Sequence, residues 1–66
     1  MIKPKAKPIV RLIGMDGNAF AIMGRVRQAL KNAGADKEYI DRYITEAMSG
    51  DYNHLLAVSM EYASVE

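Results

Sequence analysis

The spacing of apolar residues changes along the chain. Residues 9–15, "IVRLIGM", are aliphatic and contain a single charged residue, Arg11, which is typical of a largely buried strand. From residue 19 to residue 33 the apolar side chains recur instead at helical spacing; they are Ile22, Val26, Ala29, Leu30 and Ala33. The pattern predicts a strand that leads into an amphipathic helix.

The turn between these two elements reads Asp16-Gly17-Asn18. Asn18 is the favoured N-cap of the helix, and Asp16 adds a negative charge near the positive helix end. Gly17 is expected to supply a conformation that other residues disfavour. An anion site is the competing interpretation, but Asp16 stands where an anion would bind and no glycine-rich phosphate motif follows. We interpret residues 16–18 as a structural turn and cap.

A second helix follows almost at once. Gly34 suits the C′ position of the first helix, and Asp36 suits the N-cap of the next. One face of the second helix is apolar and consists of Tyr39, Ile40, Tyr43, Ile44, Ala47 and Met48. Because the connection is so short, the two helices should form an antiparallel hairpin.

Gly24 interrupts the first helix, where glycine costs about 1 kcal/mol relative to alanine. With Gly17 and Ala21 it makes a strip of small residues. We expect a segment of the same chain to pack closely there. The alternative is the close approach of a second subunit.

The C-terminal segment fits two patterns. Gly50 and Asp51 end the second helix and begin a short helical turn over residues 52–56. Residues 58–65 then alternate as a strand, although Leu55, Leu56, Ser59 and Met60 also share a helical face. The first strand needs a partner for its backbone groups, which favours the strand. A third helix remains the alternative.

These elements predict an α+β fold for residues 9–66. It is a small single domain of strand, helix, helix, short helix and strand, with a two-stranded sheet packed on a helical hairpin. Residues 1–8, "MIKPKAKP", are expected to be a flexible basic tail, because Pro4 and Pro8 block regular pairing.

Composition limits the chemistry that is available. The chain has 66 residues, half of them hydrophobic, with no cysteine and one histidine. Disulfides, thiolate zinc sites and histidine metal clusters are thereby excluded, and we expect no metal and no cofactor. No signal peptide and no apolar run of membrane-spanning length are visible, so we expect a cytoplasmic protein that does not bind membranes.

The single histidine, His54, is the strongest candidate for acid–base chemistry, with Asp51 three residues before it. No nucleophile with its base and orienting group can be recognised in the sequence. We therefore predict no catalytic residues and no enzyme activity.

Charge is divided between the two halves of the chain. Residues 1–34 hold seven basic residues and one acidic residue, whereas residues 35–66 hold two basic and seven acidic residues. The candidates for nucleic-acid binding are Arg25, Arg27, Lys31, Lys3, Lys5 and Lys7. No aromatic residues interleave them, so a solvated face that complements the acidic half is the favoured interpretation.

Self-association is a further expectation. In the first strand, Val10 and Leu12 point to one side and Ile9 and Ile13 to the other. Since so few helices can hardly cover both faces of the sheet, we expect Ile9 and Ile13 to be exposed and to favour a symmetric homodimer.

Two motifs give a resemblance. Residues 14–20, "GMDGNAF", and residues 49–56, "SGDYNHLL", are similar to a GxDGNAF helix start and an SGDYxxLL turn in a family of small bacterial and phage proteins. The likeness covers residues 9–66. It implies a bacterial or mobile-element setting and transfers no catalytic or binding residues. The sequence therefore predicts a non-enzymatic protein-interaction domain, with nucleic-acid binding as the alternative.

Overall fold

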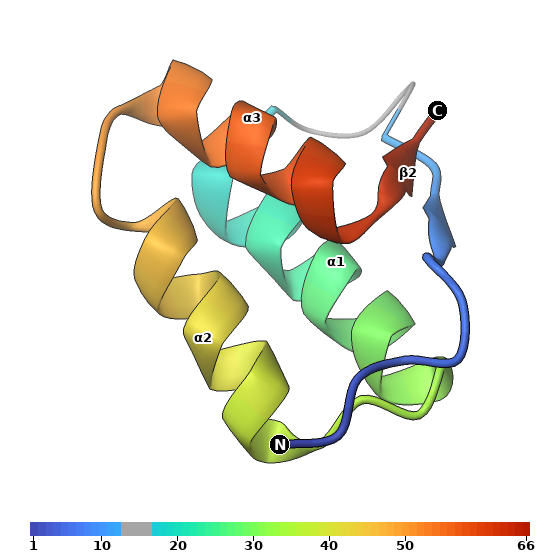
Figure 1. Ribbon diagram of the computed structural model, residues 1–66. Coiled ribbons are helices and arrows are strands. Elements are labelled where there is room, and N and C mark those ends of the chain that lie inside the picture. Colours follow the sequence, from blue (N-terminus) through green and yellow to red (C-terminus); the bar gives the residue numbers. More distant parts are fainter. Residues whose placement is uncertain (13–16) are drawn as a thin grey trace.

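The computed structural model describes residues 1–12 and 17–66, which form three helices and a two-stranded parallel sheet. In chain order the elements are β1 (Ile9–Val10), α1 (Ala19–Asn32), α2 (Lys37–Ala47), α3 (Tyr52–Tyr62) and β2 (Ser64–Val65). The helix α1 is central and packs against α2, α3 and β1 (Figure 1). A small α+β domain is confirmed in outline.

The hairpin of α1 and α2 is closed by caps that the sequence encodes locally. Gly34 has a φ of 99°, and its N–H donates to the carbonyl of Lys31. The N–H of Ala35 donates to the carbonyl of Leu30, which completes a Schellman motif. The carboxylate of Asp36 then accepts from the N–H of Tyr39 at 2.9 Å, and this bond is the main reason why the pKa of Asp36 is lowered. Gly34 and Asp36 hold the positions predicted for them.

The C-terminal prediction was wrong over most of its length. Residues 58–62, expected in a strand, belong to α3, and only Ser64–Val65 pair as β2. The side chain of Asp51 accepts from the N–H of His54 at 2.8 Å and starts the helix. Leu55, Val58 and Ser59 are then buried on one helical face. Burial of this face selects the helix, which was the alternative to the strand favoured from the sequence.

The sheet is short and parallel, with Ile9 opposite Ser64 and Val10 opposite Val65. The N–H of Leu12 donates to the carbonyl of Glu66 at 2.7 Å, so backbone pairing extends beyond β1. The long strand expected over residues 9–15 is nevertheless not formed at Arg11 and Leu12. The sheet lies against α1 and α3, while α2 lies on the far side (Figure 1). Of the predicted hairpin, the sheet therefore contacts α1, and its second neighbour is α3 in place of α2.

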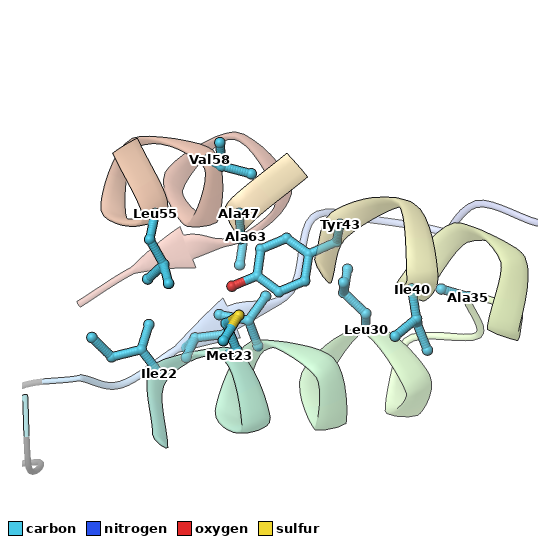
Figure 2. Packing of buried hydrophobic residues seen from close by; sticks show 12 residues of the cluster. Ile22, Met23, Leu30, Ala35, Ile40, Tyr43, Ala47, Leu55, Val58 and Ala63 are labelled. Carbon is cyan, nitrogen blue, oxygen red and sulfur yellow. The ribbon is translucent and has the colours of Figure 1, made fainter. Parts of the chain in front are cut away.

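The core gathers around Tyr43, which is fully buried with Val26 and Leu30 (Figure 2). The Tyr43 hydroxyl lies 2.7 Å from Oγ of Ser59, which itself donates to the carbonyl of Leu55. The tyrosine therefore donates to the serine, and both buried hydroxyls are satisfied. Since an unpaired buried polar group is costly, this pair fixes the position of α3 on α2.

The segment before β1 follows the α1–α2 turn. The carbonyl of Ile2 accepts from the N–H of Asp36 at 3.1 Å, and the N–H of Lys5 donates to the carbonyl of Ala33 at 3.3 Å. Lys3, Lys5 and Lys7 are exposed. The flexibility of residues 1–8 stays a prediction.

Candidate functional site

The start of α1 is closed by its own side chain. Oδ1 of Asn18 accepts from the N–H of Phe20 at 2.8 Å, so Asn18 is the N-cap that the sequence favoured. Asp16 lies outside the described residues. The carbonyl of Gly17 accepts from the Tyr52 hydroxyl at 2.6 Å, which ties the turn to α3, while the special backbone conformation expected at Gly17 stays a prediction. This arrangement anchors the turn and leaves it a structural role.

The carboxylate of Asp51 accepts from the backbone N–H of His54, and the imidazole of His54 contacts other groups. Nε2 of His54 lies 3.0 Å from the Ser49 hydroxyl and 3.0 Å from the carbonyl of Glu46, to which Ser49 also donates. A carbonyl only accepts, so Nε2 carries the proton that reaches it. The imidazole therefore cannot accept the serine proton as a base. The pair caps the C-terminal end of α2.

Gly50 makes this cap sterically allowed. A Cβ at Gly50 would lie 2.7 Å from Cγ of His54 and 2.8 Å from its Cβ. Any side chain there would push the ring of His54 away from Ser49 and from the end of α2.

The tyrosines form a cluster at the contact between α2 and α3. The ring of Tyr62 meets those of Tyr39 and Tyr43 edge-on, at centroid distances of 5.5 and 5.2 Å. Burial raises the pKa of Tyr43, and burial together with the nearby Glu46 raises the pKa of Tyr62 to about 12. Both shifts arise from packing and mark a structural cluster.

The basic candidates of α1 lie on more than one side of the helix. Arg25 and Arg27 are both exposed, but at two residues apart they lie about 200° apart around α1. Arg27 and Lys31 line one hollow together with Lys37, which the sequence did not single out. Asp41 lies in the same hollow, so its charge is mixed.

A surface groove lies between α1 and α2, and we call it the α1–α2 groove. Phe20, Met23, Gly24 and Arg27 line it from α1, and Asp41, Ile44 and Met48 line it from α2. Phe20 is 74% exposed and Met48 is 59% exposed. The groove continues toward Tyr52 at one end and toward Lys31 and Lys37 at the other.

Gly24 lies in the wall of this groove. A Cβ built on it meets nothing within 4 Å, so the close packing expected within the chain was wrong. Ala47 and Met48 were both placed on the buried face of α2, and this was wrong for Met48, which follows the last residue of the helix and is exposed. Phe20 was missed altogether. The available signal was its place off the apolar stripe of α1, where a large aromatic residue has no core to fill.

No helix among the described residues is long and apolar enough to cross a membrane. Over residues 1–12 and 17–66, no three acidic, histidine or cysteine residues are close enough to share a metal ion. Searches of protein-family models, of curated proteins and of solved structures found no match to this chain.

Proposed function

We propose that this protein is a non-enzymatic interaction domain that binds another protein through the α1–α2 groove. The observation that carries the proposal is the exposure of Phe20, 74% in a side chain that water solvates poorly, beside an exposed Met48. Aromatic residues, methionine and arginine are the residue types enriched at protein interfaces. The setting we propose is the cytoplasm of a bacterium or of a phage-infected cell.

The chemistry of the groove suits an apolar side chain or helix of a partner. Met48 has an exposed, flexible thioether side chain, which adapts to different shapes, while Met23, which also lines the groove, is buried in the core. Gly24 offers space in which a partner can approach the backbone of α1. Arg27 and Asp41 supply charges of both signs beside the apolar part, and these can orient a partner.

Site-specific photo-crosslinking tests this proposal. A benzophenone amino acid replaces Phe20, and a matched variant carries it at Ile9, which is 67% exposed on the sheet away from the groove. Irradiation in host cells should give protease-sensitive adducts from position 20 and few from position 9. Equal labelling at both positions, or none at position 20, would contradict a binding role for the groove.

Nucleic-acid binding is the second candidate, because Arg27, Lys31 and Lys37 line one hollow. If it is correct, affinity for random DNA or RNA falls steeply with salt, and Arg27→Ala lowers the slope by about 1. Arg25→Ala is the matched control on the other side of α1. The absence of binding at low salt would remove this candidate.

A further inference from the structure

We infer that the partner held by the α1–α2 groove is a second copy of this chain, in a two-fold dimer with α1 of each copy on α2 of the other. This inference rests on the proposed function of the groove. Its basis is the distribution of charge and apolar residues across the two walls of the groove.

The lining residues of α1 have lining residues of α2 opposite them across the groove, and the two helices run in opposite directions. Phe20, Gly24 and Arg27 follow one another along α1, and Met48, Ile44 and Asp41 follow in parallel along α2. A two-fold axis parallel to the helices places α1 of one copy opposite α2 of the second copy with the same pairing of residues. Phe20 then meets Met48 of the second copy, Gly24 meets its Ile44, and Arg27 meets its Asp41, each twice.

Charge favours the dimer in which α1 docks on α2 over the symmetric dimer in which α1 docks on α1. The helix α1 contains three basic residues and no acidic residue, for a charge of about +3, whereas α2 contains three acidic residues, Glu38, Asp41 and Glu46, against two basic ones, Lys37 and Arg42. Docking α1 on α1 would bring cations together without a counter-charge, while docking α1 on α2 brings opposite charges together. Among the described residues, neither Arg27 nor Asp41 forms an ion pair shorter than 4.0 Å within its own chain.

The sheet surface is the less suitable place for a dimer. Ile9 is 67% exposed, but Lys7 and Arg11, which lie two residues from it on either side along the chain, are also exposed. Two copies docked there would place like charges against each other. Ile13, the other residue expected at that surface, lies outside the described residues.

Charge exchange between two variants is the decisive experiment. Arg27→Glu and Asp41→Arg are each studied alone by sedimentation equilibrium at low salt, from micromolar to millimolar concentration. Each should raise the dissociation constant of its homodimer about tenfold, since two exposed pairs become repulsive. An equimolar mixture of the two should form a heterodimer near wild-type affinity. In that heterodimer the carboxylate introduced at position 27 faces the guanidinium introduced at position 41, and the unchanged Asp41 of one variant faces the unchanged Arg27 of the other.

The mixture separates the interface from effects within one chain. A loss of folding caused by either substitution cannot be repaired by adding the other variant. Phe20→Ser should weaken the wild-type dimer about a hundredfold if it is a central contact, while Ile9→Ser should leave it unchanged. Circular dichroism of both variants checks that the helices are intact.

Each outcome bears on the inference. A monomer mass at every concentration, a dimer insensitive to Phe20→Ser, or a mixture that stays monomeric overturns it. A dimer broken by Ile9→Ser would place the contact on the sheet and also overturn it. If the chain is monomeric but position 20 still crosslinks to another protein, the second copy is wrong and the interaction domain stands.

Discussion

Both sides of α1 carry apolar residues, yet only one side is packed against other parts of the chain. On the inner side Val26 and Leu30 are completely buried against Tyr43 and the rest of the core. On the groove side Phe20 is 74% exposed and Gly24 has open space around it. Hydrophobicity along a helix therefore indicates where contacts are favourable, while the neighbouring elements decide which of those contacts are made within the chain.

The largest expected effect separates these two sides directly. Leu30→Ala should lower the free energy of unfolding by about 2–5 kcal/mol, because it leaves a cavity in the core. Phe20→Ala should change it by less than about 0.5 kcal/mol, since the ring touches mostly solvent in the monomer. Urea denaturation of dilute protein measures both. A similar cost for the two would show that Phe20 belongs to the core.

Gly50→Ala should be the next most destabilising change, at about 1–3 kcal/mol, because its Cβ crowds the ring of His54. The same experiment in a His54→Gly background supplies the control, since this change removes both the ring and the Cβ that would lie 2.8 Å from the added atom. In the His54→Gly background, Gly50→Ala should cost clearly less. An equal cost in both backgrounds would rule out the steric explanation.

Asn18→Ala removes the cap at the start of α1 and should cost about 1 kcal/mol. Asn18→Asp keeps the acceptor oxygen and is the matched control, with stability close to that of the wild type. Thermal unfolding of both variants gives the comparison. A cap that contributes nothing would leave Asn18→Ala unchanged.

Gly24→Ala should act in the opposite direction and stabilise the monomer by about 0.5–1 kcal/mol. The added methyl group meets no atom, and alanine has the higher helix propensity. Gly34→Ala is the contrast, since its φ of 99° makes an added side chain strained. Destabilisation by Gly24→Ala in dilute solution would mean that the groove is occupied within the chain.

The pH dependence of the free energy of unfolding tests the buried contact of Tyr62 with Tyr43. This effect is the smallest of the set at neutral pH. The pKa of Tyr62 is about 12 in the folded chain and about 10 when unfolded. Stability is therefore complete below about pH 10 and is lost as the pH rises toward 12, because the unfolded state ionises first. Urea denaturation across this range should show the loss, and Tyr62→Phe should reduce it. An unchanged profile in Tyr62→Phe would contradict this origin.

The candidate site was only partly predictable. The caps at Asn18 and Asp36 and the turn at Gly34 depend on a few neighbouring residues, so their positions could be predicted from the sequence. The α1–α2 groove could not, because it depends on how α1 and α2 cross and on what remains uncovered. Arg25 and Arg27 share a charge but lie on different sides of α1, and net charge along the sequence does not show that difference.

The sequence by itself determined the start of α1, the turn from α1 into α2, and the small α+β character, since local hydrogen bonds and helical spacing encode them. Tertiary structure alone decided the helical state of residues 58–62, the parallel pairing of β1 with β2, and the exposure of Phe20 and Met48. Both patterns at residues 58–62 bury apolar side chains, so local propensity could not choose between them. Packing of Leu55, Val58 and Ser59 around Tyr43 made the choice, because it satisfies both the apolar core and the buried hydroxyl pair.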